Sequence, residues 1–398
     1  MEQPLSKPFE ISPVDAQNDA TLDRQISRAC DRMEKIYLDD CYTKLTVSRS
    51  WSKHNPVISG EMARPSAYRW YLTRELRRLA KKGATIRIEP SRKRVDLGSP
   101  ALLETIDEND WDLTQKKLFL FEPERIDLSA ARIEHYTGTQ VEQFQRYILL
   151  TNYQMHMQAF WDLYPGCTRP TRENVQMPAY HMCAPDNSGV SIINIGVGPS
   201  NAKNFTDHIA VLRPDAMLMV GHCGGIRNRQ EIGDFVLASG YMRADRVLDE
   251  NLPINVPITP NDILNGYLAS VLDEAGMTYR LGTVYTTVDR NWEFALQGTL
   301  NDLRLSRAIG IDMESATVAT NGFRYRIPNA TFLCVSDKPL HGKPKLPDSA
   351  VEFYRDTQRK HIGLAINALK RASKDWPRGL PTSSIRAPDE PLMGGPMD

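Results

Sequence analysis

The sequence predicts an α/β protein in which a mostly parallel sheet is covered by helices and is preceded by a smaller α+β domain. Three observations predict this class. From about residue 145 onward, short apolar segments alternate with segments of helix length. Several of these apolar segments run directly into glycine-rich turns or acidic residues, at the strand ends where open α/β sheets bind ligands. Before residue 145, helical and alternating patterns are mixed, which indicates a separate region.

The N-terminal third is predicted to contain two helices and a half-buried strand, at 29–45, 66–82 and 84–89. In the second helix, Leu72, Leu76 and Leu79 recur at helical spacing, while basic residues fill its other faces. Gly83 follows, as is typical just after a helix C-terminus. An acidic loop is expected near residues 104–112.

The remainder is predicted to alternate strands with helices. Strands are expected at 147–151, 191–197, 216–220, 233–239, 281–287, 308–311 and 330–336. Helices are expected at 154–162, 200–212, 261–275, 313–325 and 349–372. We therefore divide the chain into a flexible lead-in (1–28), an N-terminal α+β domain (29–144), a sheet domain (145–375) and a disordered, proline-rich tail (376–398).

Composition excludes several classes of function. The 398 residues are 41% hydrophobic and 25% charged, typical of a soluble globular protein. The formal net charge is zero, so no overall field attracts nucleic acid or a membrane surface. No secretory signal and no apolar run of membrane-spanning length is present, so a cytoplasmic location is expected.

The cysteines and histidines do not indicate a metal. The six cysteines are scattered, with no CxxC or CxxH pairing, which fits a reducing compartment. The eight histidines form no HExxH motif and no close cluster along the sequence. Neither structural zinc nor a metal-dependent enzyme is expected.

The segment Cys334–His341 carries the strongest chemical signal. An apolar run ends abruptly at Ser336 and Asp337. In an open α/β sheet, ligands bind beyond the carboxyl ends of the strands, so Asp337 is well placed for proton chemistry on a small molecule. A charged side chain that merely follows a buried strand is the simpler alternative.

Two glycine-rich turns follow strands. The turn that begins at Gly196 resembles the start of a dinucleotide fingerprint, but Asn201 stands where the third glycine is required. An NAD site is therefore not expected. In the second turn, Gly221-His222-Cys223-Gly224-Gly225, glycines let the backbone approach a ligand closely, or simply make a tight connection.

The segment Asp312-Met313-Glu314-Ser315 opens a predicted helix. The helix dipole alone would favour a carboxylate there. Glu314 could also accept hydrogen bonds from adjacent sugar hydroxyls, and Met313 could supply an apolar surface beside the ring.

These segments occur in one order and carry a family resemblance. Residues 145–372 resemble the nucleoside phosphorylase and nucleosidase superfamily, whose members share a GSCG-type turn, a MEA or MES helix start and a terminal SD pair. Longer strings resemble the AMP nucleosidase family within it: HYTGT, LLTNY, NIGVGPSNAKN, GHCGGI, DRNWE and VSDKPLH. The resemblance covers the N-terminal domain more loosely. It implies a nucleoside phosphorylase-like three-layer α/β/α domain that needs no cofactor and takes AMP as substrate.

The resemblance also implies residue roles. Asp337 would be the general acid at N7 of adenine, because an adenine anion leaves poorly without protonation. Glu314 would hold the ribose 2′- and 3′-hydroxyls, and Met313 would pack under the sugar. Asn152 and Tyr153 would line the sugar end, although a structural role for their loop is equally consistent with the sequence.

Departures from phosphate-using relatives indicate hydrolysis. Their two phosphate-binding arginines correspond to Met219 and His156, and the serine of their GSCG turn corresponds to His222. Inorganic phosphate would therefore lack its bidentate partners, and water becomes the expected nucleophile. The first-strand loop that begins at Thr151 contains no acid, so the sequence does not identify the group that orients this water.

Ligands for the 5′-phosphate are expected among Lys338, Arg290 and His222, with Lys338 preferred. Trp292 could stack on adenine, although anchoring its loop is the more conservative interpretation.

The N-terminal domain is regulatory in the AMP nucleosidase family, with ATP activating and phosphate inhibiting. The nine basic residues between Arg74 and Arg94 could bind such an effector, or could simply form a solvated surface. Family resemblance also implies a homo-oligomer, specifically a hexamer. A phosphorylase and a nucleic-acid-binding protein are the competing hypotheses, disfavoured respectively by Met219 and His222 and by the neutral net charge.

Overall fold

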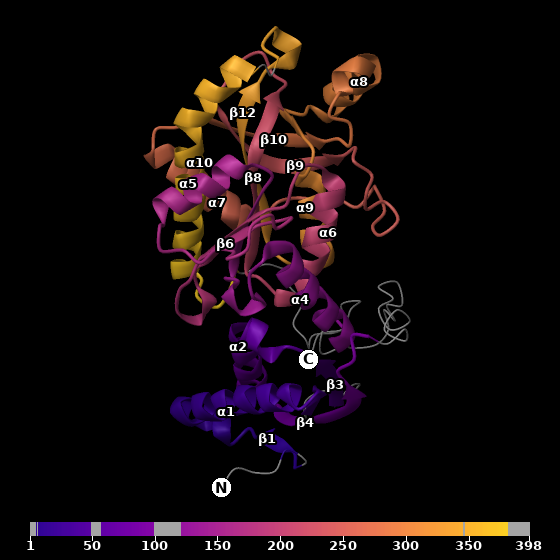
Figure 1. Cartoon of the computed structure of the whole chain (residues 1–398), viewed down its shortest axis with the longest axis vertical. Helices are drawn as coiled ribbons and strands as arrows, with labels where there is room; N and C mark the ends of the chain where they lie inside the picture. Colours follow the sequence, from indigo (N-terminus) through magenta and orange to yellow (C-terminus); the bar gives the residue numbers. More distant parts are fainter. Residues whose placement is uncertain (1–4, 6, 49–56, 99–120, 345–346, 381–398) are drawn as a thin grey trace. The chain divides into compact units, whose positions relative to one another are not determined.

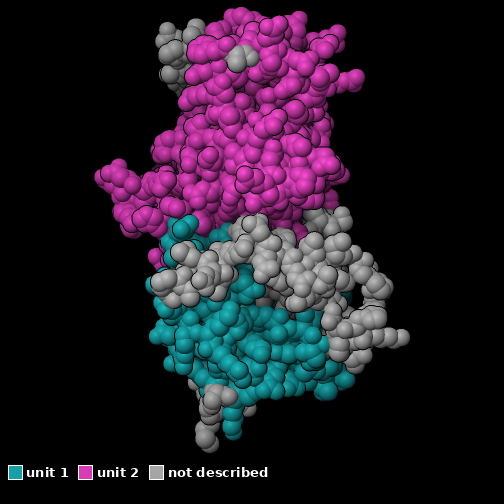
Figure 2. Space-filling view, turned by 90° about the vertical axis from the view of Figure 1, so that its right-hand side faces the viewer, with its two compact units in different colours: residues 1–132, 386–398 teal, residues 133–385 magenta. Residues whose placement is uncertain are grey.

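The computed structural model describes residues 5, 7–48, 57–98, 121–344 and 347–380. The chain divides into two compact units, one containing Met1–Arg132 and the other Ile133–Ile385 (Figure 2). Within the described residues, no helix is both long and apolar enough to cross a membrane.

The first unit contains a four-stranded antiparallel sheet in the order β1-β4-β2-β3. Its strands are β1 (Phe9–Ile11), β2 (Cys41–Ser48), β3 (Val57–Met62) and β4 (Thr85–Arg94). Its helices are α1 (Asp19–Leu38) and α2 (Arg69–Lys81), and α4 (Pro123–Thr137) crosses the boundary between the units. The leucines expected on the inner face of α2 are buried, as the helical spacing predicts.

The expected helix 29–45 is wrong at both ends. Helix α1 begins at Asp19, because the side chain of Asn18 accepts a hydrogen bond from the Thr21 amide at 2.9 Å and caps the helix. The expected lead-in 1–28 therefore contains half of α1, together with β1. Asp40 has a φ of +53° and ends the helical segment, and the chain then enters strand β2.

Other elements of this unit were not predicted from the sequence. Strands β1, β2 and β3 and helix α4 are absent from the expectations. Strand β1 has only three residues, the start of β2 was assigned to the helix 29–45, and α4 follows a segment without clear periodicity. The expected acidic loop near residues 104–112 lies outside the described residues.

The second unit contains an eight-stranded sheet in the order β11-β10-β9-β12-β8-β5-β7-β6, with an additional pairing between β11 and β8. Its strands are β5 (Tyr147–Thr151), β6 (Ala179–Met182), β7 (Val190–Asn194), β8 (Ala216–Gly225), β9 (Phe235–Arg243), β10 (Tyr279–Thr286), β11 (Gly310–Asp312) and β12 (Asn329–Asp337). Most neighbours are parallel, and β6–β7, β9–β12 and β8–β11 are antiparallel. Because β11 pairs with both β10 and β8, the strands β8, β12, β9, β10 and β11 close into a ring.

Helices cover both faces of this sheet, which confirms the expected three-layer α/β/α class (Figure 1). Helices α5 (Gln154–Leu163), α7 (Asp262–Glu274) and α10 (Pro347–Asp375) lie on one side, and α6 (Pro199–Ile209) and α9 (Ser315–Arg324) lie on the other. Each expected strand of this unit corresponds to a strand of the structure. The additional strand β6 and helix α8 (Leu296–Ser306) were not expected from the sequence.

The C-terminal segment expected to be a disordered tail begins differently. Arg146 donates a 2.7 Å hydrogen bond to the Pro377 carbonyl, and Leu380 is buried. These contacts hold the start of the segment against the second unit. The rest of it, from residue 381, lies outside the described residues.

Candidate active site

The site is built where several strands of the second unit end. Strands β5, β8 and β12 are neighbouring and parallel, so their carboxyl ends meet at one edge of the sheet. The turn after β7 and the segment after β11 reach the same region through the contacts described next. The expected site residues Asn152, Glu314 and Asp337 lie at or just after strand ends, and Gly221 lies within β8.

Glu314 lies at the N-cap of α9 and is 2% exposed. One of its carboxylate oxygens accepts a 2.6 Å hydrogen bond from the amide of Gly198, which is itself the N-cap of α6. The side chain of Asn152 is a second hydrogen-bond partner. Gly198 has a φ of +103°, a conformation that favours glycine, and this conformation aims its amide at the carboxylate.

A second carboxylate, Asp312, lies close behind Glu314. It accepts a 2.6 Å hydrogen bond from the Thr286 hydroxyl and bonds from both the amide and the hydroxyl of Ser315. Burial, followed by the charge of Asp312, raises the pKa of Glu314 to about 8. Burial also raises the pKa of Asp312. In the absence of ligand, this pair therefore retains a proton near neutral pH.

Asp337 ends β12, as the sequence indicated. The hydroxyl of Ser336 donates to its carboxylate at 2.5 Å. A Cβ atom on Gly224 would lie 3.5 Å from the other carboxylate oxygen of Asp337 and 3.0 Å from Cγ2 of Ile311. Gly224 thus pairs with the strand that ends in Asp337 and with the strand that leads to Glu314. The expected glycine turn Gly221–Gly225 is instead the second half of strand β8, because it pairs with β12 and β11, and Gly224 lies between the strands that carry the two carboxylates.

The sugar-end candidates lie around Asn152, which bonds to Glu314. A Cβ atom on Gly221 would lie 3.7 Å from the side-chain oxygen of Asn152, which connects the β8 turn to the Glu314 network. The Tyr153 ring packs edge-on against His222, with ring centroids 4.6 Å apart. The structure therefore brings Asn152, Tyr153, Gly221 and His222 together around the end of β5.

The remaining candidates differ in their placement. Met313, which stands between Asp312 and Glu314 in the sequence, is half-buried. Trp292 is buried in an apolar cluster with Ile226 and Ile311. Such packing agrees with a role in anchoring its loop.

The cationic candidates Lys338 and Arg290 differ in their burial. Lys338 is buried, and its ammonium group donates to the Asn228 carbonyl at 2.9 Å and lies 4.0 Å from Glu231. Arg290, in the loop after β10, is exposed. The last residue of β10, Thr286, pairs with Asp312, so this loop starts beside the carboxylate pair.

Sequence reasoning missed two parts of this region. The Gly198 amide was noted only within an incomplete dinucleotide fingerprint, yet its positive φ and its proximity to Glu314 make it part of the site. The histidines His156, His222 and His361 were expected to be scattered, but they meet inside the fold. Their sequence spacing gives no signal, because they belong to α5, β8 and α10.

Comparison with known proteins agrees with this architecture. The family model described as the phosphorylase superfamily matches residues 168–371. The chain is 38% identical over 433 aligned positions to an AMP nucleosidase of Escherichia coli (strain K12), covering 88% of each chain. It is also 20% identical to a guanosine phosphorylase of Halorubrum lacusprofundi, covering 46% of this chain and 77% of that protein.

Comparison with solved structures also agrees with this architecture. The structure resembles the crystal structure of AMP nucleosidase from Bacteroides thetaiotaomicron, with a TM-score of 0.54 and 29% identity. That match covers 63% of this chain and 98% of the other. A uridine phosphorylase from Vibrio fischeri matches with a TM-score of 0.50 and 16% identity, covering 58% of this chain and 93% of that one, and so supports the fold alone.

Proposed function

Because the chain belongs to the AMP nucleosidase family within the phosphorylase superfamily, we propose that it hydrolyses the N-glycosidic bond of AMP. Water attacks C1′ as the bond from C1′ to N9 of adenine breaks, and the products are adenine and ribose 5-phosphate. The observation that carries this proposal is the placement of two carboxylates, Glu314 and Asp337, at the ends of β11 and β12, two strands that both pair with Gly224 of β8.

Asp337 acts as the general acid. Proton transfer to N7 neutralises the negative charge that develops on the departing base, an effect worth about 10²–10⁴-fold in rate. The bond from Ser336 orients one carboxylate oxygen, and Gly224 leaves space beside the other. This arrangement supports an acid whose position is fixed before the substrate arrives.

Glu314 holds the ribose hydroxyls. Its carboxylate is fixed by Gly198 and Asn152 in a buried position, where electrostatic interactions are stronger than in water. As C1′ gains positive charge in the transition state, an ionised Glu314 stabilises it most. Met313, half-buried beside Glu314, packs under the sugar.

Hydrolysis is favoured over phosphorolysis by the side chains around the β5 and β8 ends. Met219, His156 and His222 are all buried, so three positions that bind phosphate in phosphorylases offer no guanidinium group. For the 5′-phosphate of AMP, the exposed Arg290 is better supported than Lys338, whose ammonium group is bonded to Asn228.

We also propose that ATP and phosphate control the reaction by binding to the first unit. Several cations of the basic stretch are already paired: Arg77 with Asp23, Lys81 with Asp19, and Lys93 with Glu61 and Glu124. An anionic effector would have to displace these carboxylates. Hydrolysis of AMP measured with and without ATP tests this part independently of the reaction itself.

Product analysis tests the reaction. The purified chain is incubated with AMP or adenosine, with and without inorganic phosphate, and the bases and sugars are separated by chromatography. We expect adenine and ribose 5-phosphate from AMP without added phosphate. Product formation only when phosphate is added would indicate a phosphorylase, and failure to release adenine would overturn the proposal.

The Asp337→Asn variant tests the assignment of the acid. The amide preserves the shape of the side chain but cannot transfer the proton, so we expect hydrolysis to fall about 10²-fold or more while AMP binding persists. Turnover is measured under saturating AMP, and binding by calorimetry. Near-normal turnover would remove Asp337 from the mechanism.

A further inference from the structure

Three buried histidines, His156, His222 and His361, converge from separate elements of the second unit. His156 lies in the first turn of α5, His222 in β8 and His361 in α10. One ring nitrogen from each lies within 4.8 Å of the corresponding atoms of the other two. Among the described residues, this is the group of potential metal ligands that the fold assembles.

The ring of His361 is oriented by the backbone. Its Nε2 atom lies 3.0 Å from the Phe332 carbonyl oxygen. A carbonyl oxygen only accepts hydrogen bonds, so Nε2 carries the proton and Nδ1 presents its lone pair. Nδ1 is buried and has no hydrogen-bond partner among the described residues. A buried acceptor without a partner is costly, and so indicates that something else occupies the space it faces.

His156 has the complementary arrangement. Its Nδ1 atom lies 2.7 Å from the Thr151 hydroxyl, and its buried Nε2 atom has no hydrogen-bond partner among the described residues. When Nδ1 donates to the hydroxyl, Nε2 presents a lone pair toward the cluster. Histidines that ligate metals almost always use their second nitrogen in such a bond, which fixes the tautomer and the ring orientation.

Burial keeps the rings of His156 and His361 neutral. It lowers the pKa of His361 to about 4 and that of His156 well below its ordinary value. Metal ligation requires neutral imidazole, so at neutral pH neither ring has to lose a proton to bind an ion.

We propose that His156, His222 and His361 bind one divalent transition-metal ion of the zinc class. Imidazole nitrogen suits zinc, copper, nickel and iron, whereas magnesium and calcium prefer oxygen ligands. With metal–nitrogen distances of about 2.0–2.1 Å, the nitrogens of a tetrahedral site lie roughly 3.4 Å apart. The longest separation among the three ring nitrogens must therefore shorten by up to about 1.4 Å.

The contraction requires a change in the relative orientation of the rings. The rings of His156 and His222 are stacked, with centroids 5.1 Å apart and an interplanar angle of 26°. Hydrogen bonds to Thr151 and to the Phe332 carbonyl fix the orientation of the His156 and His361 rings. Three protein ligands leave a fourth tetrahedral position open, and a water molecule or another small ligand completes it.

Metal binding is tested on the full-length chain after removal of adventitious ions with a chelator. Zn²⁺ is added, the excess is removed by gel filtration, and the bound metal is measured by mass spectrometry. A parallel sample receives Co²⁺, whose visible absorption reports tetrahedral coordination. We expect one ion per chain and a tetrahedral Co²⁺ spectrum. A chain that retains no stoichiometric ion, or a crystal structure with water between the three rings at saturating Zn²⁺, would overturn the proposal.

Two variants remove ligand atoms while keeping the second-nitrogen contacts. His361→Gln retains an Nε2 donor for the Phe332 carbonyl and lacks Nδ1. His156→Asn retains a polar group for Thr151 and lacks Nε2. Because loss of an outer partner alone typically costs 10–100-fold in metal affinity, we expect loss of a ligand to weaken binding about 100-fold or more.

A matched control separates this site from surface binding. His135 is exposed, and His135→Gln should bind the ion as the unaltered chain does. Near-ultraviolet circular dichroism checks the fold of each variant. If a ligand variant fails to fold, anomalous diffraction at the zinc edge on the unaltered chain still decides the outcome, because the ion must lie between the three rings. Ligand variants that bind as tightly as the control would contradict the proposal.

Discussion

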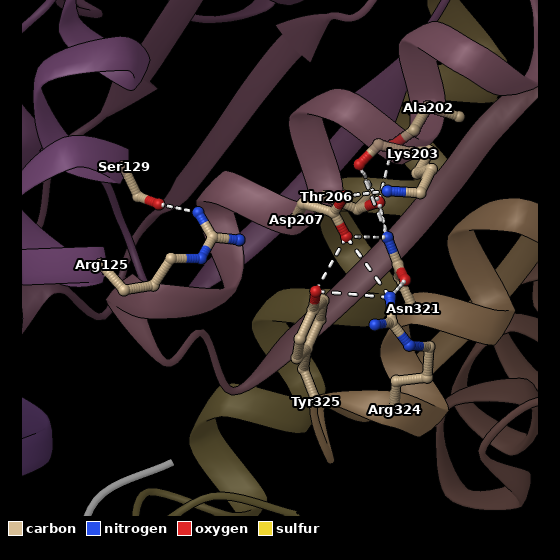
Figure 3. Close-up of polar contacts among 9 residues, drawn as sticks. All are labelled: Arg125, Ser129, Ala202, Lys203, Thr206, Asp207, Asn321, Arg324 and Tyr325. Carbon is tan, nitrogen blue, oxygen red and sulfur yellow. Dashed lines mark hydrogen bonds and ion pairs between the residues drawn. The ribbon is translucent and has the colours of Figure 1, made fainter. Parts of the chain in front are cut away.

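Helices α6 and α9 carry a buried carboxylate at each end of their contact, and the two carboxylates differ in what compensates them. Toward the C-terminal ends, Asp207 accepts hydrogen bonds from Asn321 and Tyr325 at 2.8 Å and pairs with Lys203 at 2.6 Å and Arg324 at 3.5 Å (Figure 3). At the N-terminal ends, Glu314 is held by the Gly198 amide and the Asn152 side chain.

The difference explains why one carboxylate is structural and the other suits a substrate. Asp207 is compensated by two cations and fastens the helices together. Among the described residues, neither Glu314 nor Asp312 forms an ion pair. Backbone amides, neutral side chains and the positive ends of two helix dipoles stabilise these carboxylates instead. None of these groups carries a full positive charge, so the negative charge of an ionised Glu314 is only partly balanced. A sugar that becomes cationic can balance the rest of this charge.

The largest effect is expected from substitution of Glu314, the carboxylate that suits a substrate. Glu314→Gln retains the shape of the side chain and an acceptor for the Gly198 amide, but it cannot lose the proton that Glu314 and Asp312 retain without ligand, and so cannot form the carboxylate that stabilises the cationic sugar. We expect kcat/KM for AMP to fall about 10²-fold or more. Steady-state kinetics measure this change, with Glu231→Gln, an exposed position, as the matched control. Equal kinetics for the two variants would mean that the Glu314 charge is not used.

Asp207→Asn tests the structural role of the other carboxylate. It leaves Arg324, which is largely buried, without its carboxylate partner. Loss of one partner of a buried pair typically costs 3–5 kcal/mol, and because Lys203 is partly solvated we expect about 3 kcal/mol of unfolding free energy. Urea titration measures this loss, and kcat of the folded variant should change little. A selective loss of kcat with intact stability would instead place Asp207 in the chemistry.

The pH dependence of stability sharpens the comparison further. The pKa of Glu314 is raised in the folded chain to about 8, whereas the unfolded side chain titrates near its ordinary value. Between these values the folded state binds more protons, so stability falls as pH rises, by at most about 1.4 kcal/mol per pH unit for one group. Asp312 acts in the same direction.

Unfolding free energies measured between about pH 5 and pH 8 test this prediction. Glu314→Gln should flatten the fall, because the amide does not titrate. An unchanged slope in that variant would show that Glu314 is already ionised in the folded chain.

Lys203→Met is expected to have the smallest effect. Lys203 pairs with Asp207 one helical turn away and is partly exposed, so solvent screens the interaction. We expect a loss below about 1 kcal/mol in the same urea titration. A loss as large as that of Asp207→Asn would mean that Lys203, rather than Arg324, is the main compensating cation.

Much of the second unit follows from the sequence, because its strands are continuous apolar runs with glycines or acids at their ends. Asp337 and Glu314 were found by that signal, and the structure places both at strand ends. The contact between Gly198 and Glu314 could not be predicted, since it joins residues 116 positions apart and depends on the way α6 and α9 pack. His361 gave no signal for the same reason.

The first unit was harder to predict. Helix α1 was placed ten residues too late, because the capping role of Asn18 was overlooked. The preference for Lys338 as a phosphate ligand rested on its proximity to Asp337 in the sequence. Its side chain instead turns toward Asn228, and a single sequence contains no information on that direction.

The double pairing of β11 also limits how the sheet of the second unit can meet other chains. Because β11 bonds to β8 as well as β10, the described sheet has one open border, at β6, which is four residues long and is bridged to Thr168. Unpaired borders of sheets invite strand addition by other chains, and proteins resist this by keeping such borders short or covered. Assembly of several copies through this unit would therefore use helical or loop surfaces rather than strand addition.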